Sequence, residues 1–208
     1  YRQNTPAAIQ QLKQRLVGDA NATVITYAPT WRDDDAIQTG QYHFELPFSL
    51  QRFFEQVDDN AVLVLRPHYL VKDHIDIKGF EDRVKIIADE DIANLYLITD
   101  LMITDYSSVM FDFANLNRPM LFYAYDLEHY RDQLRGFYFN YQAEIPGPLA
   151  TTEADFDAYV AQFAKQGDFP DYRSQLAGFN AKYCEWEDGA ASQKVAEVIL
   201  GGIKKWRY

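Results

Sequence analysis

Five apolar runs, separated by helical patterns, constrain the fold more than any other feature of the chain. The runs are "ATVITYAP" (22–29), "AVLVLRPH" (61–68), "RVKII" (83–87), "LMITD" (101–105) and "PMLFYAY" (119–125). Because each run is apolar at consecutive positions, both faces of the strand that it predicts must be covered. Buried strands that alternate with helices are typical of a parallel sheet with helices on both sides. The predicted fold class is therefore α/β, with a Rossmann-like parallel sheet flanked by helices.

Three segments between these runs have helical periodicity and open on residues that cap helices. They are "SLQRFFEQV" (49–57), "DIANLYLI" (91–98) and "SSVMFDFANL" (107–116), with Ser49, Asp91 and Ser107 as the predicted caps. From Thr151 onward the pattern is helical only. The aromatic-rich stretch 126–150, which ends in Pro146-Gly147-Pro148, predicts an ordered loop across a face of the sheet. With no linker in between, we expect a single domain over 1–208, with a helical part at about 151–208.

Composition and charge disfavour several classes of protein. No run of eighteen apolar residues and no signal-peptide pattern occurs, so we expect no membrane span. The single cysteine, Cys184, cannot form an internal disulfide, which favours a reducing compartment such as the cytoplasm. It also has no Cys or His neighbour at zinc spacing, which disfavours a structural zinc site. The formal net charge of −11 disfavours wide contact with nucleic acid, because lysines and arginines supply most of that affinity.

The stretch "DLMITDYSSVMFDFA" (100–114) joins a predicted strand to a predicted helix through a polar turn. Ligands of open parallel sheets bind beyond the carboxyl ends of the strands, near the point where the strand order reverses. Ser107 and Ser108 fall at the start of the helix, where free backbone N–H groups attract anions. Asp112 follows Ser108 by one helical turn, so its carboxylate can accept hydrogen bonds from a ribose diol. With Asp105, these residues predict a site for a nucleotide diphosphate.

A purely structural role is the alternative for this turn. Taken alone, "DYSS" favours a reading in which Ser107 only caps the helix and Asp105 only ends the strand. The turn also lacks the Gly-x-Gly-x-x-Gly pattern, which disfavours a dehydrogenase that binds NAD or FAD. The spacing of Asp112 and the polar residues at two other strand ends shift the balance toward a ligand.

Those two strand ends carry cations and hydrogen-bond donors. In "LRPHYLV", Arg66 can pair with phosphate oxygens, and His68 can bind phosphate or exchange a proton near neutral pH. The alternative is a surface arginine and a histidine that bonds to the backbone. In "YAPTWRDDD", Thr30, Trp31 and Arg32 offer a hydroxyl, an aromatic wall and a further cation.

We predict no metal site in the chain. The acidic run 33–35 is more typical of a solvated loop than of a metal site, because consecutive residues cannot all face one ion. The remaining histidines are His43, His74 and His129, and each is expected to have a surface or packing role.

In the order and spacing of its motifs, the chain resembles the carboxyl-terminal half of the CDP-glycerol glycerophosphotransferases, the polymerases and primases of teichoic acid synthesis. The matching motifs are "YAPTWRD" (27–33), "LRPHYLV" (65–71), "DLMITDYSSVMFDFANLNRPMLFYAYDLEHY" (100–130), "RGFYFNY" (135–141), "PGPL" (146–149) and "DGAAS" (188–192). The resemblance implies the donor-binding, carboxyl-terminal half of a GT-B glycosyltransferase-like fold. It also implies that the chain is a fragment of a longer two-domain enzyme and is inactive without the amino-terminal domain.

The resemblance further implies a reaction and roles for the residues. Glycerol phosphate, or a related polyol phosphate, would pass from CDP-glycerol to the terminal hydroxyl of a membrane-linked teichoic acid chain, with release of CMP. His68 and Arg66 would be catalytic, and no cofactor is implied. The donor-binding residues would be Thr30, Trp31, Arg32, Asp105, Ser107, Ser108 and Asp112. The family uses two histidines; His68 matches one, and the other has no counterpart in this sequence. The enzyme would lie on the inner face of the cytoplasmic membrane, held by parts outside this chain.

Two other functions stay open at this point. A sugar-nucleotide-dependent glycosyltransferase domain would use the same helix start and the same ribose carboxylate. A non-catalytic nucleotide-binding or interaction module would instead recruit partners through the aromatic residues of 122–141. The identity of the polyol and the choice between priming and polymerisation also stay open.

Overall fold

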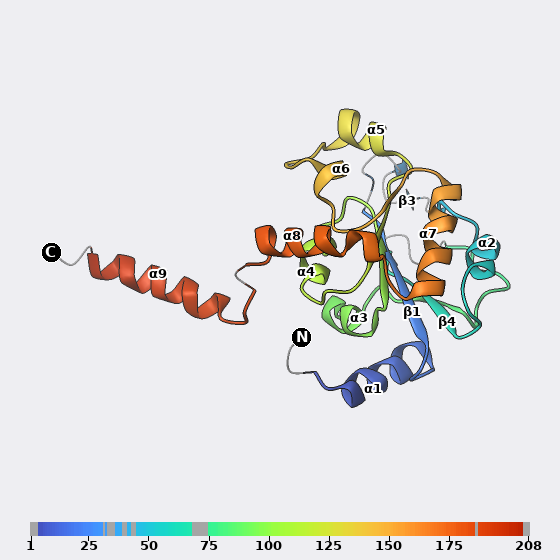
Figure 1. Cartoon of the computed structure of the whole chain (residues 1–208), viewed down its shortest axis with the longest axis horizontal. Helices are drawn as coiled ribbons and strands as arrows, with labels where there is room; N and C mark the ends of the chain where they lie inside the picture. Colours follow the sequence, from blue (N-terminus) through green and yellow to red (C-terminus); the bar gives the residue numbers. More distant parts are fainter. Residues whose placement is uncertain are drawn as a thin grey trace.

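The computed structural model describes residues 4–30, 32, 36–38, 41–42, 45–67, 75–185 and 187–205. Its centre is a six-stranded parallel sheet in the order β5-β4-β1-β6-β7-β8 (Figure 1). The strands are β1 (Thr23–Ala28), β4 (Ala61–Leu65), β5 (Val84–Ile86), β6 (Leu101–Thr104), β7 (Met120–Tyr123) and β8 (Leu149–Ala150). A separate antiparallel pair consists of β2 (Ala36–Gln38) and β3 (Gln41–Tyr42). The five predicted strands and their parallel arrangement are thus confirmed.

The strand order places a reversal of the chain path at the middle of the sheet. From β1 the chain adds β4 and β5 on one side, then crosses to add β6, β7 and β8 on the other. The reversal lies between β1 and β6, which pair directly from Ile25 with Leu101 to Ala28 with Thr104. In a sheet of this kind, the crevice beyond the carboxyl ends of these two strands is the expected place for a ligand.

Helices cover both faces of the sheet because the strands are apolar on both. Along β1, Ile25 and Tyr27 belong to one core cluster, whereas Val24 and Ala28 belong to the clusters of the opposite face. Helices α2 and α7 cover the first face, and α1, α3, α4 and α8 cover the second (Figure 1). The helical elements are α1 (Pro6–Val17), α2 (Leu50–Glu55), α3 (Ile92–Ile98), α4 (Val109–Ala114), α5 (Leu127–His129), η2 (Tyr130–Leu134), α6 (Tyr141–Glu144), α7 (Glu153–Gln166), η3 (Pro170–Tyr172), α8 (Arg173–Tyr183) and α9 (Ala191–Lys205).

The capping predictions hold for two helices and shift by one residue for the third. Ser49 accepts a hydrogen bond from the N–H of Arg52, and Asp91 accepts one from Ala93. The predicted cap Ser107 is wrong by one position, because α4 begins at Val109 and its N-cap is Ser108. The hydroxyl of Ser107 accepts a long, weak bond of 3.4 Å from the N–H of Val109 instead. The turn before α4 is therefore one residue longer than the sequence predicted.

The stretch 126–150 is more structured than the predicted loop. It contains the short helical elements α5, η2 and α6 and ends in a sixth strand, β8, that the sequence analysis did not predict. Backbone bonds from Phe122 to Pro148 and from Ala124 to Ala150 hold β8 against β7. Gly147 makes this approach possible, because a Cβ atom at its position would lie 2.1 Å from the carbonyl oxygen of Met120.

The helical pattern predicted from Thr151 onward is confirmed over the described residues, where α7, η3, α8 and α9 follow one another. In Figure 1, α9 extends away from the sheet, beyond α8. A search of the described residues for a helix both long and apolar enough to cross a membrane finds none.

Candidate ligand site at the carboxyl edge of the sheet

The ends of β1 and β6 meet at the reversal of the chain path. The backbone N–H of Thr30, two residues after β1, donates to Oδ1 of Asp105, the residue that follows β6, at 2.8 Å. The side chain of Thr104, the last residue of β6, donates to the carbonyl oxygen of Ala28 at 2.7 Å. The predicted convergence of these two strand ends is therefore present in the structure.

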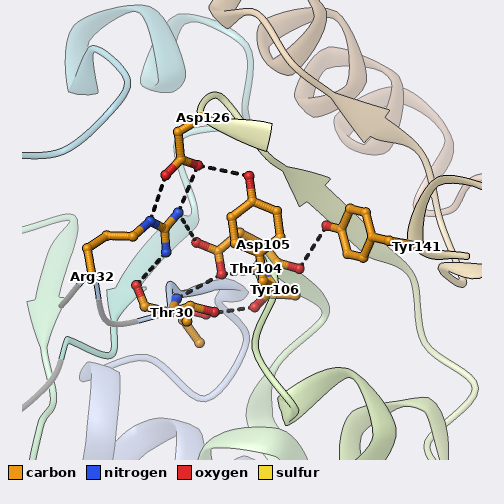
Figure 2. A network of polar contacts seen from close by, with 8 residues as sticks. Thr30, Arg32, Thr104, Asp105, Tyr106, Asp126 and Tyr141 are labelled. Carbon is orange, nitrogen blue, oxygen red and sulfur yellow. Dashed lines mark hydrogen bonds and ion pairs between the residues drawn. The ribbon is translucent and has the colours of Figure 1, made fainter. Parts of the chain in front are cut away.

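Arg32 joins three strand ends through its guanidinium group (Figure 2). It donates to Oδ2 of Asp105 at 2.9 Å, to both carboxylate oxygens of Asp126 at 2.7 and 3.0 Å, and to the carbonyl of Thr30 at 2.7 Å. The side chains of Arg32 and Asp105 are only 5% and 1% exposed, and that of Asp126 is 18% exposed. Four of the five guanidinium N–H bonds are thus used inside the protein. We call Arg32, Asp105 and Asp126 the charged triad.

Tyrosine side chains surround the charged triad. The hydroxyl of Tyr106 donates to Asp126 at 2.8 Å, and its ring stacks on that of Tyr130 with 3.9 Å between ring centres. The hydroxyl of Tyr141 donates to the backbone carbonyl of Asp105 at 2.9 Å (Figure 2). The guanidinium carbon of Arg32 lies 5.0 Å from the centre of the Tyr106 ring and 5.4 Å from that of Tyr130. Cation–π contacts of this kind stabilise a cation that is shielded from water.

The two carboxylates of the triad favour the charged form of the Arg32 guanidinium. Burial disfavours the charged form of Arg32, but the carboxylates of Asp105 and Asp126 outweigh it and raise the pKa of the guanidinium. Burial, followed by the charge of Asp126, raises the pKa of Tyr106 far above its usual value. Burial and then Asp105 raise the pKa of Tyr141 in the same way. Both tyrosines therefore stay neutral and keep their hydroxyl protons for donation at physiological pH.

The turn that follows Asp105 has polar groups that the protein does not use. Ser108 is exposed, and its hydroxyl forms no capping bond. The backbone N–H groups of Ser107 and Ser108 donate to no residue in the part of the chain that the structure describes. Because α4 has only six residues, its dipole is small, and these free N–H and hydroxyl groups are the main attraction for an anion.

The other predicted site residues are placed as follows. Arg66, half-buried after β4, donates from its guanidinium to the carbonyl of Ile87 at 3.1 Å; β1 separates β4 from β6. Asp112 is exposed in the first turn of α4, and its carboxylate bonds to no described residue. The hydroxyl oxygen of Thr30 is buried and likewise has no described partner. The predicted residues Trp31 and His68 lie outside the described residues.

The sequence analysis missed Asp126, Tyr106 and Tyr141. A signal for Asp126 was present, because it follows the fifth apolar run by one residue just as Asp105 ends the fourth. No such signal existed for Tyr141, which lies 36 residues from Asp105 in the sequence.

Within the described ranges, no group of three His, Cys, Asp or Glu side chains is arranged to hold a metal ion. The acidic run 33–35 falls outside those ranges.

Comparison with known proteins gives consistent matches over nearly the whole chain. The family model described as CDP-Glycerol:Poly(glycerophosphate) glycerophosphotransferase matches residues 1–201. The teichoic acid glycerol-phosphate transferase of Staphylococcus aureus is 44% identical over 201 residues, which are 96% of this chain and 51% of that protein. The teichoic acid poly(glycerol phosphate) polymerase of Bacillus subtilis is 43% identical over 204 residues, or 96% of this chain and 27% of the relative.

Solved structures agree with the sequence comparisons. A histidine variant of the wall teichoic acid polymerase TagF, soaked with CDPG, superposes with a TM-score of 0.81 at 35% identity. The superposition covers 97% of this chain and 49% of that one. The chain thus spans about half the length, or less, of the relatives that it matches. Because the family model matches residues 1–201 and the two relatives are 44% and 43% identical over 96% of the chain, the chain belongs to the CDP-glycerol:poly(glycerophosphate) glycerophosphotransferase family.

Proposed function

We propose that this chain binds CDP-glycerol for an enzyme that transfers glycerol phosphate to the terminal hydroxyl of a lipid-linked teichoic acid chain and releases CMP. The observation that carries the proposal is the turn after β6, where the N–H and O–H groups of Ser107 and Ser108 donate to no described residue at the reversal of the sheet. Family membership identifies the type of anion, since the matched family is that of glycerophosphotransferases.

The donor contacts follow from the chemistry of each group. Ser107 and Ser108 bind diphosphate oxygens through their N–H and hydroxyl groups. The buried hydroxyl of Thr30, beside Asp105, is a further donor for the same oxygens. Asp112 accepts hydrogen bonds from the ribose hydroxyls. The family resemblance assigns Trp31, which follows Thr30, to the donor as well.

The reaction requires charge stabilisation more than covalent catalysis. An acceptor oxygen forms a bond to the glycerol-bearing phosphorus, the bond from that phosphorus to the bridging oxygen breaks, and CMP leaves with the electron pair. Arg66 and the donors of the β6–α4 turn stabilise the charge that develops on CMP. His68 serves as a proton donor or acceptor near neutral pH, in line with its place in the "LRPHYLV" motif.

The partners of the whole protein follow from this reaction. The acceptor is a lipid-linked polymer, so the enzyme works at the inner surface of the cytoplasmic membrane, attached through residues outside this chain. Because the chain spans about half the length of its relatives or less, we expect it to bind the donor and the full-length natural protein to carry out transfer.

Calorimetric titration of the chain with CDP-glycerol, CDP-ribitol, CMP and UDP-glucose tests the proposal. Cytidine diphosphates should bind and UDP-glucose should not. Ser108→Ala and His68→Ala should each weaken CDP-glycerol binding, by about tenfold or more for a lost hydrogen bond to a charged oxygen.

Ser174→Ala is the matched control, because Ser174 is an equally exposed serine on α8. It should leave the affinity unchanged. Binding of UDP-glucose in preference to CDP-glycerol would instead identify a sugar-nucleotide-dependent glycosyltransferase domain. Binding of the donor without transfer by the full-length protein would identify a non-catalytic module.

A further inference from the structure

Asp105 of the charged triad precedes the proposed donor turn by two residues, and the groups of the triad are bound to one another. Four of the five N–H bonds of Arg32 are used, and tyrosine rings cover its guanidinium. Asp105 accepts from Arg32, from the N–H of Thr30 and from the N–H of Tyr106 at 2.6 Å. The fifth N–H belongs to a side chain that is only 5% exposed, and a phosphate could reach the other groups of Arg32 and Asp105 only by displacing existing hydrogen bonds. Two residues that the sequence assigned to the donor are therefore poorly placed to contact it.

The same bonds fix the backbone immediately before the donor site at several points. The carboxylate of Asp105 is held by Arg32, and its carbonyl by the hydroxyl of Tyr141. The hydroxyl of Tyr106 is held by Asp126, which lies three residues after the end of β7. Ser107 is the next residue along the chain. The orientation of its N–H, and of the N–H of Ser108, thus depends on the bonds that hold Asp105 and Tyr106.

We propose that Arg32, Asp105 and Asp126, together with the hydroxyls of Tyr106 and Tyr141, are positioning residues that orient the Ser107–Ser108 turn toward the diphosphate and do not contact the donor. This inference rests on the proposed function. It assigns a role to Asp126, Tyr106 and Tyr141, and it changes the role of Arg32 and Asp105 from ligand to support. A turn whose donors are already oriented binds an anion without the entropic cost of ordering them.

Two buried tyrosines allow a matched test of positioning against simple stability. Tyr141 and Tyr123 are both 2% exposed, and each hydroxyl donates to a backbone carbonyl, at 2.9 Å to Asp105 and at 2.8 Å to Pro47. Removal of either hydroxyl should lower the thermal unfolding temperature to a similar extent. Only Tyr141→Phe should weaken CDP-glycerol binding, by about fivefold, whereas Tyr123→Phe should leave it unchanged.

A double-mutant cycle then tests whether the effect passes through the turn. Combined with Ser108→Ala, Tyr141→Phe should add little further loss, because the donors that it orients are already impaired. Tyr106→Phe, which frees Asp126 from the turn, should behave in the same way and serves as the second variant. In the full-length protein, cytidine affinity should not change for either variant, because cytidine lacks the diphosphate.

Three results would overturn the inference. One is an equal loss of donor affinity in Tyr141→Phe and Tyr123→Phe, which would indicate a general effect of stability. Another is a loss of CDP-glycerol affinity in the double mutant that equals the product of the fold-losses in the two single mutants, which would indicate that the tyrosine contacts the donor independently of Ser108. The third is unchanged donor affinity in both Tyr106→Phe and Tyr141→Phe. Failure of the unchanged protein to bind CDP-glycerol would overturn the proposed function and this inference together, whereas the other results concern the inference alone.

Discussion

Asp105 of the charged triad and the Ser107–Ser108 turn are neighbours in the sequence and opposite in character. Asp105 is almost fully buried, and its carboxylate bonds to Arg32, Thr30 and Tyr106. Ser108, three residues later, is exposed and has no capping bond. Within four residues, the chain passes from a carboxylate that is hydrogen-bonded inside the protein to a serine whose hydroxyl forms no such bond.

This difference separates two functions that the same residue types can serve. Charged groups that are buried must be paired, so they report on the stability and rigidity of the protein. Polar groups at a strand end that have no partner within the protein are available to a ligand. If this division is right, substitutions in the charged triad should first affect folding, and substitutions in the turn should first affect binding.

The largest effect is expected from Arg32→Ala. It leaves the buried carboxylates of Asp105 and Asp126 without their cation, which should lower the free energy of unfolding by about 3–5 kcal/mol. Urea denaturation measures this loss. Arg173→Ala, which removes an exposed ion pair with Asp168, is the control and should cost about 0–1 kcal/mol. Similar losses in the two variants would contradict the structural importance of the triad.

The next largest effect is expected from the double variant Ser107→Ala and Ser108→Ala. The loss of both hydroxyls should weaken CDP-glycerol binding by about 2–3 kcal/mol, as measured by calorimetry, because each can donate to a charged oxygen. The free energy of unfolding should change by less than about 0.5 kcal/mol, because neither hydroxyl is buried. A lower free energy of unfolding with unchanged affinity for CDP-glycerol would contradict the assignment of this turn to ligand binding.

A smaller effect is expected from Asp112→Asn. The variant should weaken CDP-glycerol binding by about 0.5–1.5 kcal/mol, the usual contribution of one hydrogen bond. It should also reduce the preference for CDP-glycerol over its 2′-deoxy analogue. Asp59→Asn is the matched control, because Asp59 is exposed just before β4, at the opposite edge of the sheet. An unchanged preference in Asp112→Asn would remove Asp112 from the ribose site.

The smallest effect is expected at the ion pair between Arg15 and Glu90, whose side chains are 54% and 17% exposed. Hydrogen bonds from Arg15 and Asn94 lower the pKa of Glu90 from 4.5 to about 2. A carboxylate with a lowered pKa stabilises the folded state above its usual pKa and loses that contribution as the pH falls. The unfolding temperatures of the unchanged protein and Glu90→Gln should therefore differ slightly at pH 7 and converge between pH 4.5 and 2. Glu81→Gln, in which an exposed side chain with no described partner changes, should show no such convergence.

How much the sequence could predict depended on whether the signal was local. The strands of the sheet were predictable because each is a short run of apolar residues, and the polar turn was recognisable because it lies at the end of one. Strand β8 was missed because two residues have no periodicity, and it is held by backbone bonds and by the close approach of Gly147. Its formation depends on pairing with β7, which lies more than twenty residues earlier in the sequence.

The charged triad was not predictable for a related reason. Arg32 is 73 residues from Asp105 and 94 from Asp126, and only the fold brings the three together. The sequence analysis correctly placed Arg32 and Asp105 at the carboxyl edge of the sheet. It could not show that the Arg32 guanidinium donates a hydrogen bond to the Asp105 carboxylate. A polar residue at the end of a predicted strand can be placed at the edge of the sheet from the sequence. The residue to which it forms a hydrogen bond depends on which strands are neighbours in the sheet.

A crystal structure of the chain soaked with CDP-glycerol tests the central claim most directly. The account predicts diphosphate oxygens within hydrogen-bonding distance of the N–H and hydroxyl groups of Ser107 and Ser108, with the bonds between Arg32, Asp105 and Asp126 intact. A donor bound elsewhere, with Ser107 and Ser108 free of contact, would contradict it.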